Sequence, residues 1–143
     1  MTDTTQDTDT RAVVERYVAA VEAGDGAAIR DCFSESATWR LFGDMPMSGT
    51  WRGRDSIMDE FLAGALGHYA PGSIRLEITA IVADGHRAVV EWTSRARTRR
   101  GEAYENFCVG VFTVRDGKIQ AVREYMDTAY ATRMLFGGER AAA

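Results

Sequence analysis

The second half of the chain restricts the fold most. Four runs of alternating apolar and polar residues follow one another there, at residues 73–83, 86–97, 103–114 and 118–127. Two of the three connections are Asp-Gly pairs, and Asp-Gly between alternating runs is a strong hairpin signal. The third connection is a short turn at Arg100-Gly101. This order predicts a four-stranded antiparallel meander.

The first half supplies helices and one more strand. Apolar residues recur at helical spacing over residues 10–23, which predicts a first helix. The next expected elements are a short helix over 26–33 capped by Asp25, a strand over 36–42, a loop over 43–49, and a third helix that begins behind Asp55 and ends at 67–72. The layout predicts an α+β fold in which a curved antiparallel sheet wraps around three helices.

Length and charge narrow the class of protein. The 143 residues suffice for one domain with its own core, which we expect over 10–136, with disordered tails at 1–9 and 137–143. A net charge of −4 argues against nucleic acid or an anionic membrane as the main partner. No apolar run approaches the roughly 20 residues that cross a bilayer, and nothing at the start has the pattern of a targeting signal. We expect a cytoplasmic protein.

The sequence offers little to a metal or a cofactor. Cys32, Cys108, His68 and His86 lie far from one another in the chain, without the spacing of metal ligands. Glycine-rich phosphate loops, G-x-S-x-G and H-E-x-x-H motifs are absent from the sequence. We therefore expect no metal and no cofactor. His68 is expected after the third helix, either at a pocket mouth or as a surface histidine.

Hairpin register decides the roles of two acids near the end of the chain, in "VREYMDT". Glu124 and Asp127 are three residues apart, so on a strand they point to opposite faces. A two-residue turn at Asp116-Gly117 pairs Glu124 with Val109, and a similar turn at Arg100-Gly101 sets Trp92 beside Val109. One face then carries Val90, Trp92, Ser94, Phe107, Val109, Val111, Val122, Glu124 and Met126.

Glu124 is the only mid-sheet charge on that face, which makes it a candidate general acid or base. Burial among apolar residues raises the pKa of a carboxyl towards neutrality, where it can both give and take a proton. Two alternatives stay open. A one-residue slip would bring Asp127 inward with Tyr125 and Arg123, and an arginine such as Arg40 could neutralise a purely structural Glu124.

The opposite face is half polar. We expect Glu91 and Arg123 to pair across Gly110, and Phe112 and Tyr125 to lie on this outer face. The simplest turn at Asp84-Gly85 would also place the apolar residues of 73–83 there, so we expect a bulge or two half-buried faces in that strand.

Residues 10–135 resemble the nuclear-transport-factor-2-like superfamily, in particular its SnoaL-like and ketosteroid-isomerase-like branches. The resemblance is carried by "VVERYVAAVEAGD", "SGTWRGRDSI", "VRDGKI" and "REYMD". It implies a cone-shaped sheet around a pocket for a small hydrophobic molecule and a homodimer through the outer sheet face. Such pockets host several reactions as well as non-catalytic binding.

The resemblance also assigns roles to residues. Tyr17 matches the tyrosine that donates a hydrogen bond to the dienolate in ketosteroid isomerases, whose two catalytic aspartates fall at Leu41 and near Val109 or Gly110. In limonene-epoxide-hydrolase-like enzymes the water-holding tyrosine and asparagine match Trp39 and Leu41. Glu124 matches one member of the hydrolase Asp-Arg-Asp network, and it also matches the acid/base aspartate of SnoaL-type cyclases.

The sequence thus leads to a set of expectations. The catalytic candidates are Glu124 and Tyr17, and the expected substrate-binding residues are Trp39, Leu41, Trp92, Phe107, Val109 and Met126. The leading hypothesis is a cofactor-independent acid/base enzyme of cyclase, isomerase or dehydratase type, acting on a polyketide- or terpenoid-like molecule. The alternatives are a binding or dimeric scaffold protein of the same fold, and an epoxide hydrolase-like activity.

Overall fold

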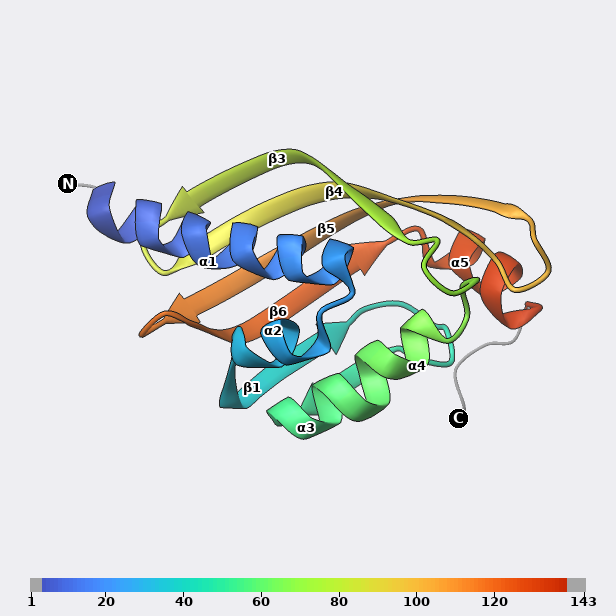
Figure 1. Cartoon of the computed structure of the whole chain (residues 1–143), viewed down its shortest axis with the longest axis horizontal. Coiled ribbons are helices and arrows are strands. Elements are labelled where there is room, and N and C mark those ends of the chain that lie inside the picture. Colours follow the sequence, from blue (N-terminus) through green and yellow to red (C-terminus); the bar gives the residue numbers. More distant parts are fainter. Residues whose placement is uncertain (1–3, 139–143) are drawn as a thin grey trace.

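The four alternating runs form the predicted meander. In the computed structural model, which describes residues 4–138, β3 (Arg75–Asp84), β4 (Arg87–Arg97), β5 (Ala103–Arg115) and β6 (Lys118–Met126) pair antiparallel in that order. β1 (Phe33–Leu41) pairs parallel to β6, and β2 (Gly49–Arg52) pairs antiparallel to β1. The result is a curved, open sheet of order β2-β1-β6-β5-β4-β3 (Figure 1). The predicted α+β class with a curved sheet is confirmed, and β2 is an element that the sequence did not reveal.

Helices lie against one face of this sheet, and the last of them lies at one end of the sheet, beyond β6 (Figure 1). They are α1 (Thr4–Ala23), α2 (Gly26–Asp31), a continuous third helix made of α3 (Arg54–Ser56), η1 (Ile57–Leu62) and α4 (Ala63–Leu66), and α5 (Thr128–Phe136). Asp25 caps α2 as predicted, accepting a hydrogen bond from the Ala28 amide at 3.1 Å. The third helix begins at Arg54, before Asp55, and its η1 part has π-helical geometry. α5 was not predicted from the sequence.

The first helix starts earlier than expected. Residues 4–9, predicted as part of a disordered tail, belong to α1. The cause is a contact with the β3–β4 turn: the Gly85 amide donates to the Asp7 carboxylate at 2.6 Å, and the Thr10 hydroxyl donates to the Gly85 carbonyl at 2.7 Å.

The predicted C-terminal tail also begins too early, because Gly137 caps the end of α5 and the Gly138 amide donates to the Thr132 carbonyl at 3.0 Å. Residues 1–3 and 139–143 of the predicted tails lie outside the described residues.

The register of β5 differs by one residue from the prediction in its pairing with β4 and in its pairing with β6. Trp92 lies opposite Cys108, and Glu124 lies opposite Gly110, whereas Val109 was expected beside both. Between β4 and β5 the chain makes a loop over residues 98–102 in place of a two-residue turn, and the β5–β6 ladder contains an irregularity between Thr113 and Val114. Side chains of β5 are therefore exchanged between the two faces, while those of β4 and β6 keep their predicted faces.

This exchange overturns two expectations about the outer face. Glu91 and Arg123 do not flank Gly110, because Gly110 faces the helices. Glu91 instead accepts a hydrogen bond from the Thr79 hydroxyl at 2.8 Å, and Arg123 donates to the Tyr125 hydroxyl at 3.1 Å. Phe112, expected outside, is only 2% exposed.

β3 contains the bulge that its sequence required. The ladder to β4 shifts between Ile78 and Ala80, so Ile78 lies opposite Trp92 and Ile81 lies opposite Val90. Both apolar sets of the strand can thus contribute to the inner face. Val82, after the bulge, points outward and is 64% exposed.

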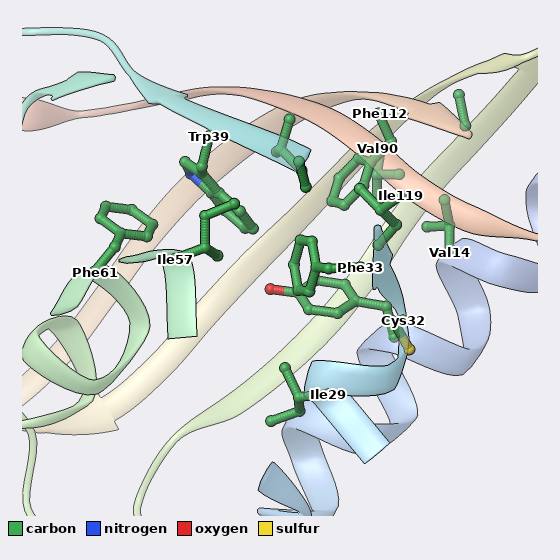
Figure 2. Close-up of a cluster of buried hydrophobic side chains, with 14 of the residues drawn as sticks. Val14, Ile29, Cys32, Phe33, Trp39, Ile57, Phe61, Val90, Phe112 and Ile119 are labelled. Atoms are coloured by element: carbon green, nitrogen blue, oxygen red, sulfur yellow. The ribbon is translucent and has the colours of Figure 1, made fainter. Parts of the chain in front are cut away.

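The core lies between the helices and the inner face of the sheet. Figure 2 shows Val14 of α1, Ile29 of α2 and Phe61 of η1 pointing towards side chains of the strands. The sheet contributes Trp39, Val90, Phe112 and Ile119, which are all nearly inaccessible to solvent. In the described part of the chain, no helix combines the length and the hydropathy needed to cross a membrane.

Candidate functional site

The Glu124 side chain lies on the concave face of the sheet, which faces the helices. Alternation along β6 directs Val122, Glu124 and Met126 towards the helices, and Glu124 is only 7% exposed. On the neighbouring strand β1, Trp39 also points inward, and its indole Nε1 donates to the Glu124 Oε1 at 3.1 Å. Burial raises the pKa of Glu124 to about 7, and the hydrogen bond from Trp39 opposes this rise. The carboxyl therefore exists in both protonation states near neutral pH.

The structure contradicts both the one-residue slip that would bring Asp127 inward and the pairing of Glu124 with Arg40. Arg40 points to the outer face, where it donates to the Thr50 hydroxyl at 3.1 Å and stacks over Phe42, so it does not neutralise Glu124. Asp127 lies beyond the end of β6 and caps α5 by accepting from the Tyr130 amide at 3.0 Å. Tyr125 is on the outer face, as the register placing Glu124 inward requires.

A cavity of about 140 Å³ surrounds the Glu124 side chain. Six of the eight predicted site residues line it: Glu124, Tyr17, Trp39, Leu41, Trp92 and Met126. Phe107 and Val109 do not, because β5 presents its other face to the cavity, and Phe107 is 65% exposed on the outside. Among the described lining residues Glu124 is the one carboxylate, and no arginine or lysine joins it.

Tyr17 of α1 stands in the wall of the same cavity. Its ring packs edge-on against Phe33 at 5.5 Å and against Trp39 at 6.2 Å between ring centroids. Burial and then the charge of Glu124 raise the pKa of the Tyr17 hydroxyl, so this group stays protonated. The described residues offer that hydroxyl no hydrogen-bond partner, which leaves it able to donate to a bound molecule.

Three polar residues of the cavity wall, Tyr69, Tyr104 and Cys108, were not predicted from the sequence. Tyr69, from the segment after α4, and Tyr104 of β5 pack with ring centroids 5.3 Å apart. Cys108 lies 3.8 Å from the Ser94 hydroxyl, which accepts from the Trp92 indole at 3.0 Å. Tyr104 and Cys108 were missed because the faces of β5 are exchanged relative to the prediction. Tyr69 lies in a loop, and no local sequence pattern predicts that a loop residue lines the cavity.

The Cys108 thiol is not a nucleophile in this setting. Burial, followed by the negative charge of Glu124, raises its pKa to about 12. Because the thiolate is the reactive form, a thiol held protonated is inert. The cavity groups that remain able to exchange a proton or donate a hydrogen bond include the Glu124 carboxyl, the neutral phenols and the His68 imidazole.

One end of the cavity is closed by α5 and the segment after α4. Leu135 and Phe136 line the cavity together with His68, whose ring packs 4.3 Å from the Phe136 ring. Burial and the nearby charge of Arg99 lower the pKa of His68. Of the two positions expected for His68, pocket mouth or surface, the structure places it at the margin of the cavity.

Gly110 makes room for two aromatic rings on the inner face of the sheet. A Cβ atom at this position would stand 2.8 Å from the Phe112 ring and 3.1 Å from the Trp92 ring. The absence of a side chain therefore lets both aromatic rings lie on the inner face of the sheet. Within residues 4–138, no cluster of three or more metal-ligating side chains is formed.

Comparison with known proteins assigns the chain to a family. The sequence model of the SnoaL-like domain matches residues 14–122, from α1 into β6. The chain belongs to the SnoaL-like domain family. This confirms the resemblance to the nuclear-transport-factor-2-like superfamily that four short stretches of sequence indicated. None of the curated proteins matches the sequence.

Solved structures share the fold of this SnoaL-like protein at low sequence identity. Bal32a, from a soil-derived mobile gene cassette, has a TM-score of 0.80 and 23% identity over 91% of this chain and 98% of its own. TerC, co-crystallised with polyporic acid, has a TM-score of 0.77 and 23% identity over 90% and 98%. An LEH-like epoxide hydrolase from M. tuberculosis has a TM-score of 0.73 and 22% identity over 92% of each chain. These likenesses establish the fold and leave the reaction to be argued from the site.

Proposed function

We propose that this SnoaL-like protein is a cofactor-independent acid/base enzyme that isomerises, cyclises or dehydrates a small hydrophobic molecule. The observation that carries the proposal is Glu124, a carboxyl buried in a mainly apolar cavity with its pKa raised to about 7. Perturbed carboxyls in cavities are characteristic of catalytic acids and bases. The co-crystallised TerC and the epoxide hydrolase from M. tuberculosis support a small organic ligand for this type of cavity.

The proposed roles follow from the geometry. The Glu124 carboxylate removes a proton from a carbon or oxygen of the substrate, and the resulting carboxylic acid returns a proton at another atom. Tyr17 donates a hydrogen bond to the substrate oxygen on which negative charge develops. The apolar walls formed by Trp39, Leu41 and Met126 exclude water, which strengthens both interactions.

The first test is Glu124→Gln, which keeps the side-chain shape and removes the ability to take up a proton. Loss of a positioned acid/base group costs roughly 10²- to 10⁴-fold in turnover, and we expect a fall within that range. The substrate is first sought by turnover screening of monocyclic enones, β-keto esters and terpenoid epoxides. Full turnover by Glu124→Gln on the substrate so identified would refute the acid/base role.

The second candidate function is ligand binding without turnover. One observation favours it: Leu41, at the position of the isomerase base, is apolar, and Glu124 has no second carboxylate beside it in the described cavity wall. For such a protein, a ligand would be recovered unchanged after incubation, and its dissociation constant would be insensitive to Glu124→Gln. Opening of an epoxide by water held at Glu124 is the third candidate, and it is distinguished by a diol product.

We also propose a homodimer through the outer sheet face. Phe107, Val89 and Tyr125 expose large apolar surfaces there, at 65%, 43% and 38% respectively. Neighbouring exposed apolar residues of this kind mark protein interfaces. The sequence predicted Phe112 on this outer face. Because the faces of β5 are exchanged, Phe107 lies there and Phe112 lies inside.

A further inference from the structure

A second cavity adjoins the one that holds Glu124. Its volume is about 470 Å³, and it lies between the end of α1, the third helix and the segment before β3. The two cavities share a wall of six residues: Tyr17, Val21, Leu62, Leu66, Tyr69 and Ile74. Apart from the two phenol hydroxyls, the side chains of this shared wall are apolar. We call the two spaces the inner cavity and the outer cavity.

The volume of the inner cavity limits what it can hold. A dry apolar cavity of about 150 Å³ accommodates one benzene ring. The inner cavity, at about 140 Å³, therefore takes a single ring beside Glu124. A larger hydrophobic molecule must extend beyond the inner cavity. Two other pockets meet the inner cavity, but one shares only His68 and Leu135 with its wall and the other only Tyr104, whereas the outer cavity shares six lining residues.

The shared wall is suited to such a passage. Leu66 is 44% exposed, although it is a large apolar residue, and Leu62, Tyr69 and Ile74 are only half-buried. The wall includes the end of η1, whose π-helical turn directs Phe61 to the inner cavity and Leu62 to both. π-Helical turns inside helices occur frequently at functional sites. The outer cavity also reaches the exposed charges of Glu22 and Arg75, so its far side is polar.

We propose that the inner and outer cavities form one bipartite site for a molecule with a single ring and an elongated apolar substituent. The ring carries an oxygen group that faces Glu124 and Tyr17. The substituent passes Leu66 and Tyr69 and lies in the outer cavity. This inference rests on the proposed function for the chemistry at Glu124, and it excludes fused-ring substrates.

The test measures binding of 4-ethylphenol, 4-butylphenol and 4-hexylphenol by isothermal titration calorimetry. Transfer of one methylene from water to apolar surroundings corresponds to about a fourfold gain in affinity, so the dissociation constant should fall by about that factor per added carbon. Ala63 lines the outer cavity but not the inner one, and it is exposed. Ala63→Phe should therefore keep the affinity for 4-ethylphenol and reduce the gain per carbon to less than twofold.

Glu60→Phe is the matched control, since it adds the same ring on the same helix outside both cavities. It should retain the full gain. Leu66→Gln, which makes the shared wall polar, should also weaken 4-hexylphenol more than 4-ethylphenol, and it serves if Ala63→Phe does not fold. An unaltered gain in Ala63→Phe and Leu66→Gln, no gain in the parent protein, or no binding of any of the three phenols would overturn the bipartite site. Turnover that still depends on Glu124 would then leave the proposed function standing.

Discussion

The indole of Trp39 donates to the carboxylate of Glu124 from the neighbouring strand, and this hydrogen bond acts against the effect of burial. A hydrogen bond to the charged form lowers the pKa of a carboxyl. Trp39→Phe removes the donor and keeps an aromatic ring, so the pKa of Glu124 should rise above about 7. The limb of the pH–rate profile that belongs to Glu124 should move to higher pH.

A matched control exists in Trp51, whose indole donates to the Met47 carbonyl at 3.2 Å, away from Glu124. Trp51→Phe should leave that limb where it is in the parent protein. An unmoved limb in Trp39→Phe would mean that the indole does not set the pKa of the carboxyl.

The raised pKa of Glu124 also predicts how stability depends on pH. Between pH 4.5 and about 7 the folded protein keeps a proton that the unfolded chain has released. The free energy of unfolding therefore falls as pH rises through this window and levels off above it. The full difference is on the order of 3 kcal/mol, from 1.36 kcal/mol per pKa unit.

Urea unfolding of the parent protein and of Glu124→Gln at several values between pH 5 and 8 measures this contribution. Relative to the variant, which lacks the titrating group, the parent should lose stability as pH rises. Parallel stability curves for the two proteins would show that Glu124 titrates normally.

Among the elements, α5 depends on a single cap for its first turn. The Asp127 carboxylate accepts from the Tyr130 amide at 3.0 Å, and the Asn106 side chain fixes the Asp127 backbone by accepting from its amide and donating to its carbonyl. Asp127→Ala should lower the free energy of unfolding by about 1 kcal/mol, as loss of a cap typically does. Because Leu135 and Phe136 of α5 close the inner cavity, ligand affinity should fall as well.

Asp127→Asn is the conservative control, because asparagine caps helices about as well as aspartate. It should retain most of the stability and the affinity in thermal unfolding and calorimetry. Equal losses in both variants would assign the effect to the charge of Asp127 and not to the cap.

At the scale of the whole molecule, the exchange of faces in β5 gives the outer sheet its apolar surface. Phe107 stands on the convex side with no described residue covering it, 65% exposed, and Val109 lies on the same face. Phe107→Glu places a charge in the proposed dimer interface and should raise the dimer dissociation constant by at least about 30-fold, which is about 2 kcal/mol. Light scattering coupled to size-exclusion chromatography over a range of protein concentrations measures the dimer dissociation constant.

Phe107→Tyr, which keeps the ring, should remain dimeric at the concentrations where Phe107→Glu dissociates. A parent protein that is monomeric at micromolar concentration would contradict the proposed dimer through this face.

The position of Glu124 shows how far local patterns predict the site. Its inward direction follows from two hairpins counted from β4 to β6, and each ladder departs from the predicted register by one residue. The loop over 98–102 shifts the first ladder, and the irregularity between Thr113 and Val114 shifts the second, beyond a turn at Asp116-Gly117 that is as predicted. The two differences cancel over the pair, so Glu124 and Trp92 share the inner face as predicted. For β5, which lies between β4 and β6, only the first register shift applies. Its faces are therefore exchanged, and Phe107 and Val109 were wrongly assigned to the pocket.

The sequence by itself determined the meander, the first helices, the family and the inward carboxylate. Alternation, turn residues and caps act between neighbours in the chain, and they carry this information locally. Only the tertiary structure decided the register of β5, the N-terminal extension of α1, the position of Tyr69 and the two adjoining cavities. These features arise where segments far apart in the chain meet, as when Gly85 anchors Asp7, and side-chain packing between such segments is not encoded by any local period.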